Sequence, residues 1–365
     1  MQSSSEQYFE KLDHVRAFAA FMVFTWHFIH AAGVPVGYVP TLPLLSLLEE
    51  GHTGVSLFMT LSGYLFAKLL DGKQINYKSF LRNRALRLLP LLTVALLLQA
   101  AVWIANGASV QAVAAQIALG SVLPLWPNGA WSIAVEWHFY LILPALLFVV
   151  GLRRESALML IFAAIGLRLS LFMAGWEIHP TAYWTIISHL DQFVAGIYAW
   201  HLFRGERVQP LAVLATAMAF VTFYHWFNIS GGFNGTQASP VWIFLPAAEA
   251  AFYAVMIAAY DGSKLMLPKR LSASVSFVGT VSYSIYLLHF WYYGPVAKAV
   301  MHYVGPLSFG LSLLFSLLAF VLFLPFAALS YRCIEQPFLK LRTRYARRAS
   351  SASSTHHADV SAPTV

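Results

Sequence analysis

Charged residues and cysteine are both scarce in this sequence. Asp, Glu, Lys and Arg make up 10% of the 365 residues, whereas about 25% is usual in soluble domains. Hydrophobic residues make up 59% of the chain, more than a soluble core can absorb. The single cysteine, Cys333, excludes an intramolecular disulfide, a cysteine metal cluster and a CxxC redox pair. The composition indicates an integral membrane protein.

The sequence contains long runs of apolar residues with few charges. A helix needs about 20 mostly apolar residues to cross a hydrocarbon layer of about 30 Å. Runs of this kind lie near residues 15–33, 53–70, 88–106, 131–150, 156–174, 183–200, 210–227, 241–260, 276–293 and 309–331. The segment 107–130 is uncharged, but Asn106-Gly107 and Asn128-Gly129 interrupt it, so we expect an outer loop, with a re-entrant segment as the alternative. The sequence predicts an all-α integral membrane protein with about ten transmembrane helices.

The basic residues indicate which side each loop faces. All but two of the 23 Lys and Arg residues fall on one side of a ten-helix arrangement, and the exceptions are Lys298 and Arg168. Because Lys and Arg accumulate on the cytoplasmic side, this pattern predicts an even number of helices with both termini in the cytoplasm. Orientation thus accounts for the net charge of +8, and we expect no nucleic-acid partner.

The chain divides into a membrane domain, residues 1–341, and a short basic tail, residues 342–365. The tail is rich in Ser, Ala and His and has few large apolar residues, so we expect it to be disordered and expect no second soluble domain. His356-His357 in this tail is interpreted as an incidental polar pair, and no metal site is expected.

Ionisable residues inside the apolar runs are the first candidates for function, because they are costly at membrane depth. Arg16 and His27 are eleven residues apart in the first run. This is close to three helical turns, so both lie on one face, about 16 Å apart along the axis. Arg16 is then at the cytoplasmic mouth and His27 in the outer half of the membrane. Glu136 in the fourth run lies at a similar depth, where it could contact His27.

Structural roles are the alternative for these residues. A buried His can simply bond a neighbouring helix, and a Glu near a helix start can simply cap it. Arg168 and His289 lie in the outer half of their runs, and Asp191 and Glu249 lie nearer the middle. For these four, structural pairing is favoured, for instance between Arg168 and Asp191.

A basic cluster precedes the third run and consists of Lys78, Arg82, Arg84 and Arg87. Charge alone favours a role in orientation or lipid-headgroup binding, and an arginine cradle for the phosphates of a cytosolic cofactor is the functional alternative. Trp131, like other aromatic residues near the predicted outer ends, is typical of an interfacial belt, with stacking on a sugar as the alternative.

Six blocks in order along the chain resemble the family-3 membrane acyltransferases, which O-acylate surface polysaccharides and related acceptors. The blocks are LDHVRAFAAFMVFTWHF (12–28), GVSLFMTLSGYL (54–65), FLRNRALRLLPL (80–91), WSIAVEWHFYLILPALL (131–147), SYSIYLLHF (282–290) and YRCIEQPFLKL (331–341). Arg16 and His27 match the family's Arg-x10-His signature, and Glu136 matches its glutamate. His14 and Ala17 stand where the family has glycines, which brings close helix packing around Arg16 into question.

The resemblance implies transfer of an acyl group, with acetyl expected, from cytosolic acyl-CoA to a hydroxyl of a carbohydrate or lipid-linked glycan. It also implies a bacterial inner membrane as the location. Arg16, with Arg84 and Arg87, is expected to hold the CoA phosphates. Trp137 and His138 replace a Glu-Gln pair of the family, which indicates an altered acceptor pocket.

This chemistry requires a base, because a sugar hydroxyl is too weakly acidic to attack a thioester unaided. His27 is the candidate, since a neutral imidazole can take a proton near neutral pH. Glu136 is expected to orient that imidazole or stabilise its protonated form, and an acyl-histidine intermediate stays open. Further candidates for substrate contact or support are Arg168, His289, Trp131 and Ser62.

Two other functional classes stay open. A multi-span transporter or flippase of a glycan or small molecule would also bury charges in the membrane, but would not depend on CoA. A non-catalytic scaffold would tolerate His27→Ala.

Overall fold

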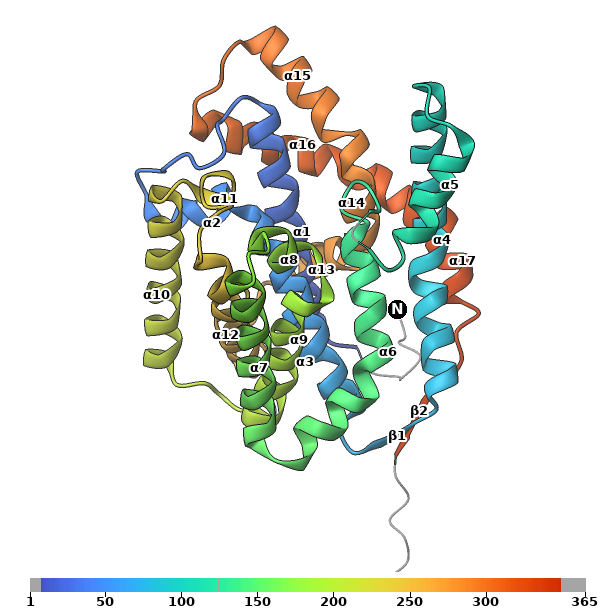
Figure 1. The fold of residues 1–365 in the computed structure, drawn as a ribbon, viewed down its shortest axis with the longest axis vertical. Helices are drawn as coiled ribbons and strands as arrows, with labels where there is room; N and C mark the ends of the chain where they lie inside the picture. Colours follow the sequence, from blue (N-terminus) through green and yellow to red (C-terminus); the bar gives the residue numbers. More distant parts are fainter. Residues whose placement is uncertain (1–7, 124, 349–365) are drawn as a thin grey trace, which may run out of the picture.

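The computed structural model describes residues 8–123 and 125–348, and these form an almost entirely helical bundle (Figure 1). The α-helices are α1 Glu10–Ala31, α2 Ser46–Glu49, α3 Gly54–Leu70, α4 Tyr77–Ala105, α5 Val110–Leu119, α6 Trp131–Leu152, α7 Arg154–Met173, α8 Ile178–Trp184, α9 Ile186–Phe203, α10 Pro210–Ile229, α11 Gly232–Gly235, α12 Val241–Gly262, α13 Lys269–Thr280, α14 Ser282–Leu288, α15 Tyr293–Val304, α16 Phe309–Ser330 and α17 Gln336–Leu339. Short 3-10 turns lie at Pro43–Leu45, Gly51–Thr53 and His289–Trp291, a π-helical turn at Tyr331–Glu335, and two strands at β1 Lys73–Ile75 and β2 Ala346–Arg348.

Seven of the described helical stretches are long and apolar enough to cross a membrane. They are Gly51–Leu70, Tyr77–Ala105, Trp131–Leu152, Glu155–Met173, Pro210–Ile229, Val241–Gly262 and Phe309–Leu339. The pair α13 and α14, with its 3-10 extension, gives an eighth if a bend of 49° is counted within one span. The protein is thus an all-α, multi-span membrane protein, while the count of ten and the cytoplasmic termini stay predictions.

The two remaining predicted spans, in α1 and α9, are helical but more polar. Both lie inside the bundle, where neighbouring helices cover them (Figure 1). Within α9, the side chains of His189, Asp191 and Gln192 are all buried. A helix surrounded by protein can carry such groups because other side chains, not lipid, satisfy them.

Helices α3 and α9 pack with their backbones in direct contact. A Cβ at Gly63 would lie 2.0 Å from the carbonyl oxygen of Phe193, and a Cβ at Gly196 would lie 2.0 Å from that of Thr60. Neither distance is possible for a real side chain, so glycine is required at both positions. Small residues allow this close approach in membrane helix pairs.

Helix α1 packs just as closely on α13. A Cβ at Gly279 would lie 2.0 Å from the carbonyl oxygen of Asp13. His14 connects α1 with both α12 and α13, because its Nδ1 lies 2.7 Å from the Tyr260 hydroxyl of α12 and its Nε2 lies 3.1 Å from the Ser272 carbonyl oxygen of α13. Close packing near Arg16 is therefore kept, with the glycine supplied by α13 and not by α1.

The start of the presumed tail is structured. Residues 346–348 pair antiparallel with β1, and the Asn76 amide donates to the Tyr345 carbonyl oxygen at 2.8 Å. The Asn83 side chain, fully buried in α4, donates to the Thr343 carbonyl oxygen at 2.6 Å and accepts from its amide at 3.1 Å. Residues 342–348 were expected to be disordered, but they pair with the bundle. Their backbone groups bond to β1, Asn76 and Asn83, and these bonds can order a segment that has few apolar residues. Residues 349–365, including His356-His357, lie outside the described residues.

The segment expected as an outer loop contains a helix. Val110–Leu119 forms α5, whose start is capped by the Ser109 hydroxyl accepting from the Ala112 amide at 3.2 Å. Gly107, with a φ of +93°, makes the turn that separates it from α4. The Asn-Gly signal marked the turn correctly, and the N-cap serine was the helix signal that the prediction missed.

Contacts between loops agree with the sidedness that the charges predict. At one end, the Lys11 ammonium donates to the Ser263 carbonyl oxygen at 2.6 Å, and β1 pairs with β2. At the other end, Asn228 donates to the carboxylate of Glu49. Each contact joins segments that the charge pattern assigns to the same side of the membrane.

Candidate active site

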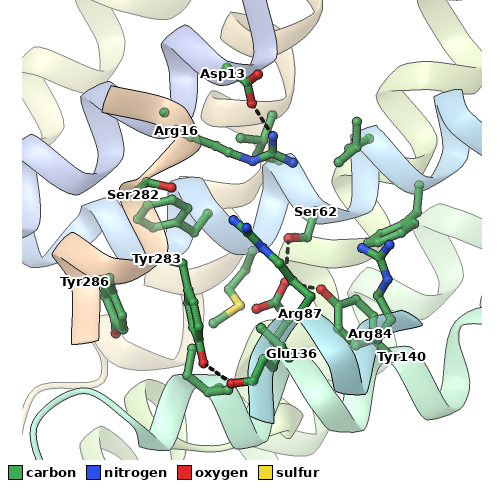
Figure 2. Close-up of a pocket in the computed structure, with 18 of the residues that line it drawn as sticks. Asp13, Arg16, Ser62, Arg84, Arg87, Glu136, Tyr140, Ser282, Tyr283 and Tyr286 are labelled. Atoms are coloured by element: carbon green, nitrogen blue, oxygen red, sulfur yellow. Dashed lines mark hydrogen bonds and ion pairs between the residues drawn. The ribbon is translucent and has the colours of Figure 1, made fainter. Parts of the chain in front are cut away.

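A cavity of about 240 Å³ lies between α1, α3, α4, α6, α13, α14 and the segment after α17 (Figure 2). Its lining includes apolar residues of α3 and α4 and a dense set of polar side chains. The polar set is Tyr8, Asp13, Arg16, Ser62, Arg84, Arg87, Ser132, Glu136, Tyr140, Thr280, Ser282, Tyr283, Tyr286, Arg342 and Tyr345. The cavity thus runs from the β-strand end of the bundle to Ser132 at the start of α6.

The predicted Glu136 is central to this cavity. It lies on α6, five residues after the helix begins at Trp131. Its Oε1 accepts from the Ser62 hydroxyl at 3.4 Å and from the hydroxyl of Tyr140, one helical turn further on (Figure 2). Side chains and not backbone amides hold the carboxylate, so it does not act as a helix cap.

The three predicted phosphate-binding arginines meet in the same cavity. Arg16 forms an ion pair with Asp13 one turn earlier on α1. Arg87 forms one with the fully buried Glu335, at 3.1 Å. Arg84 lies within an aromatic cage, its guanidinium carbon 5.2 Å from the centre of the Phe66 ring.

Two further lining residues were missed because the tail was expected to be disordered. Arg342 and Tyr345 enter the cavity from the segment that leads into β2. Their basic and aromatic character was visible in the sequence, but only the pairing of Asn83 with Thr343 brings them to the site.

His27 lies outside the residues that line this cavity. Its ring centre is 4.6 Å from that of Phe290, 5.1 Å from that of His289 and 5.2 Å from that of Tyr293. None of the hydrogen bonds or ion pairs among the described residues joins His27 to Glu136. The expected contact between these two residues is therefore not formed, because Glu136 faces the cavity, where Ser62 and Tyr140 donate to its Oε1, and His27 lies outside the cavity lining.

His289 has a defined proton position. Its Nδ1 lies 2.8 Å from the Tyr286 carbonyl oxygen and 3.1 Å from that of Ile285. Carbonyl oxygens only accept, so Nδ1 carries the hydrogen, and the buried Nε2 lacks a partner among the described residues. Tyr286 lines the cavity, and its ring centre lies 6.2 Å from that of His289, which neighbours His27.

Two other candidates have structural partners. Arg168 is fully buried and pairs with Asp191 at 2.6 Å, and its Nε donates to the Ile243 carbonyl oxygen at 2.8 Å. The predicted structural pairing is confirmed. Trp131 is also buried, with its ring centre 5.2 Å from that of Tyr183, so it packs inside the bundle and is not an interfacial belt residue.

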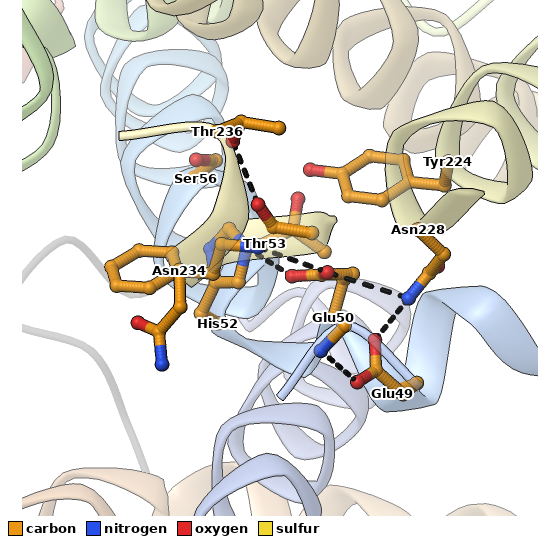
Figure 3. Close-up of polar contacts among 12 residues, drawn as sticks. Glu49, Glu50, His52, Thr53, Ser56, Tyr224, Asn228, Asn234 and Thr236 are labelled. Carbon is orange, nitrogen blue, oxygen red and sulfur yellow. Dashed lines mark hydrogen bonds and ion pairs between the residues drawn. The ribbon is translucent and has the colours of Figure 1, made fainter. Parts of the chain in front are cut away.

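A second polar cluster, which we call the outer cluster, lies beside the start of α3 (Figure 3). Its members are Glu49, Glu50, His52, Thr53, Ser56, Tyr224, Asn228, Thr236 and Glu249. Glu249 accepts from the Thr53 hydroxyl at 2.5 Å and from the Ser56 hydroxyl at 2.7 Å, so it has partners within the bundle, as structural pairing predicts. The other acids were missed because residues 34–52 were assigned to a loop.

Glu49 and Glu50 tie separate outer segments together. Glu49 accepts from the Gly37 and Tyr38 amides at 2.9 and 3.0 Å, and Glu50 accepts from the Phe233 amide at 3.1 Å. Burial raises the pKa of both carboxyls, and their mutual proximity raises that of Glu49 further. Among the described residues, no group of three or more His, Cys, Asp or Glu side chains could hold a metal ion.

Comparison with known proteins identifies the family of the chain. The model of acyltransferase family 3, described as an acyltransferase domain, matches residues 9–332. The chain is 25% identical over 342 residues to "Putative O-acetyltransferase" of Staphylococcus aureus strain COL, covering 80% of this chain and 53% of that protein. It is 27% identical over 272 residues to "Putative membrane-bound transacylase BcsY" of Komagataeibacter xylinus, covering 66% of each. No solved structure matches the chain.

The family match covers the helices that carry His27, Glu136 and the arginines of α1 and α4. The chain spans about half the length of the staphylococcal relative. The match favours an enzyme over a transporter or a scaffold. This chain belongs to acyltransferase family 3 and is a multi-span membrane protein.

Proposed function

We propose that the protein transfers an acyl group, acetyl in the first instance, from cytosolic acyl-CoA to a hydroxyl of a carbohydrate or lipid-linked glycan in a bacterial inner membrane. The observation that carries the proposal is the cavity itself, which combines Arg16, Arg84 and Arg87 with Glu136 in one elongated space. The named relatives are bacterial.

The arginines suit the donor. CoA carries a diphosphate and a 3′-phosphate, and guanidinium groups bind phosphate oxygens in a planar, two-pronged geometry. A donor held at this end would direct its pantetheine arm along the cavity toward Ser132 and Tyr286. The apolar side chains of Phe58, Met59 and Leu88 line that path and suit the uncharged arm.

His27 is the proposed base. The acceptor oxygen attacks the thioester carbonyl while His27 takes its proton. Collapse of the tetrahedral intermediate breaks the C–S bond and releases the CoA thiolate, which takes that proton from the His27 imidazolium. His289 lies beside His27 with its Nδ1 hydrogen already donated to carbonyl oxygens. Its neutral ring is a positioning group for the His27 imidazole.

Glu136 has a proposed role separate from His27. Its carboxylate faces the cavity and is held by Ser62 and Tyr140, so it is available to accept a hydrogen bond from a substrate bound there. We assign it to substrate positioning within the cavity, in place of the expected contact with the imidazole.

The test is transfer of label from radioactive acetyl-CoA to host polysaccharide and lipid-linked glycans. Wild type, His27→Ala and Arg16→Ala are compared at matched membrane levels. Label made by wild type and lost in both variants supports the proposal, and linkage analysis of the product then names the acceptor. Label retained by His27→Ala would remove that residue as the base, and no label from wild type with any acyl-CoA would overturn the donor assignment.

A further inference from the structure

The four arginines of the cavity differ in their charge partners. Arg16 and Arg87 are ion-paired with Asp13 and Glu335. Arg84 and Arg342 have no carboxylate within ion-pair distance among residues 8–123 and 125–348. Two positive charges at one end of the cavity are therefore uncompensated by the protein.

These two arginines are also close enough to repel each other. Burial lowers the pKa of Arg342 below the ordinary value for arginine, and the neighbouring charges of Arg84 and Arg87 lower it further. Arginine nevertheless stays protonated in proteins. An arrangement of like charges that persists at a cavity wall is stabilised when an anion binds there.

Unpaired polar atoms point to the same place. The Tyr345 side chain is 2% exposed, and its buried hydroxyl lacks a hydrogen-bond partner among the described residues. The buried Nε of Arg84 is unpartnered in the same way. Tyr345 and Arg84 are in contact, with the guanidinium carbon 5.8 Å from the ring centre. Buried donors are normally satisfied, so this group has capacity for an oxygen-rich ligand.

The segment that carries Arg342 and Tyr345 is held in a fixed position. The reciprocal bonds between Asn83 and Thr343 fasten it to α4, and β2 pairs with β1 beyond it. Arg84 lies one residue from Asn83 on the same helix. The two arginines are thus positioned from separate parts of the chain, which is what a preorganised anion site requires.

We propose that Arg84, Arg342 and Tyr345 form a phosphate-binding subsite that receives the phosphorylated nucleotide end of acyl-CoA. This assignment rests on the proposed function and deepens it: the segment after α17 becomes part of the donor site. Arg87, balanced by Glu335, lies beside the subsite, and Arg16 lies further along the cavity.

The direct test is binding of adenosine 3′,5′-bisphosphate to the full-length protein in detergent. This probe carries the 3′-phosphate and the first 5′-phosphate of the nucleotide end but no thioester. Arg342→Gln should weaken binding about tenfold or more, since charge-assisted hydrogen bonds are stronger than neutral ones. Arg342→Lys, which keeps the charge, should recover part of the lost affinity. Arg347→Gln is the matched control, because Arg347 is exposed on β2, outside the cavity lining. Equal affinity of wild type and Arg342→Gln, or no binding by wild type, would overturn the subsite.

A transfer assay separates this inference from the proposed function. Arg342→Gln should slow transfer from acetyl-CoA by raising KM, but leave transfer from acetyl-pantetheine, which has no phosphates, at the wild-type rate. An equal loss with both donors would overturn the subsite and leave acyl transfer intact. If wild type transfers no acetyl group but its binding of the bisphosphate still depends on Arg342, the proposed function is overturned and the subsite is not.

Anionic lipid headgroups offer the same phosphate chemistry as the nucleotide. Repeating the binding measurement in nanodiscs with and without anionic lipid distinguishes the two sources. If anionic lipid fails to displace the bisphosphate, the nucleotide assignment is supported. Full displacement of the bisphosphate by anionic lipid would overturn that assignment.

Discussion

At the scale of single residues, the structure gives Glu136 other partners than the sequence led us to expect. Its carboxylate is held by Ser62 and Tyr140 within the cavity and does not contact His27. Tyr286 of the cavity lining neighbours His289, and His289 neighbours His27. Our proposal therefore assigns proton transfer to His27 and substrate positioning to Glu136.

Glu136→Gln should reduce acetyl transfer by about 100-fold, a loss typical for a group that handles a reacting proton or positions its donor. Gln has the same size and keeps one acceptor oxygen, so the bundle should unfold at nearly the wild-type temperature. Label incorporation and thermal unfolding in detergent are measured together. Ser62→Ala, which removes only a 3.4 Å bond, should cost less than tenfold. A silent Glu136→Gln would exclude any role for its charge.

The outer cluster should make stability depend on pH. Burial raises the pKa of Glu49 to about 9 and that of Glu50 to about 8, above the ordinary carboxyl value. The folded state therefore binds more protons than the unfolded state, so stability is complete below about pH 4.5 and decreases as pH rises toward 9. The protein should therefore be less stable at pH 9 than at pH 5. His30 and His52 are the titratable neighbours of the pair.

Glu50→Gln should flatten this dependence, because the amide stays uncharged at every pH. The pH dependence of stability is measured by thermal unfolding of detergent-solubilised protein from pH 5 to 9. Glu155→Gln on the exposed surface of α7 is the control and should keep the wild-type slope. An unchanged slope in Glu50→Gln would show that other groups set the pH dependence.

At the scale of secondary-structure elements, the contact of α3 with α9 depends on two glycines. Gly196→Ala would bring a Cβ within 2.0 Å of the Thr60 carbonyl oxygen. The helices would have to separate, at a cost of about 1–3 kcal/mol, and the shift would reach the cavity because Ser62 is on α3. A lower unfolding temperature and reduced transfer are expected.

Gly166→Ala on α7 is the matched control, because a Cβ there meets no atom within 4 Å. Alanine is the better helix former by about 1 kcal/mol, so this variant should be as stable as wild type or slightly more. Equal effects of the two substitutions would contradict the close packing of α3 and α9.

At the scale of the whole molecule, the arrangement in the membrane can be tested with cysteine labelling. In a Cys333→Ser background, Lys264→Cys and Ala108→Cys place single thiols at exposed positions on opposite predicted sides. A membrane-impermeant maleimide added to sealed right-side-out vesicles should label residue 108 and not residue 264. Inside-out vesicles should give the reverse. Labelling of both from one side would overturn the predicted sidedness.

Much of this architecture could be predicted from the sequence. Apolar runs mark helices near all ten predicted ranges, because an apolar segment of that length satisfies its backbone only as a helix in lipid. The Arg168 and Asp191 pair was likewise expected, since two buried opposite charges must compensate each other. The sequence could not indicate that α1 and α9 would be surrounded by protein, because burial by neighbouring helices is a property of the assembled bundle.

By itself, the sequence determined the membrane class, the helical segments and the residues capable of chemistry, since these depend on local composition and spacing. Only the tertiary structure decided which of those residues share a cavity. Glu136 meets Ser62 and Arg84 meets Tyr345, while His27 lies behind His289. These contacts depend on how closely the helices approach each other and on which side chains face inward. Both are set by packing between segments far apart in the chain.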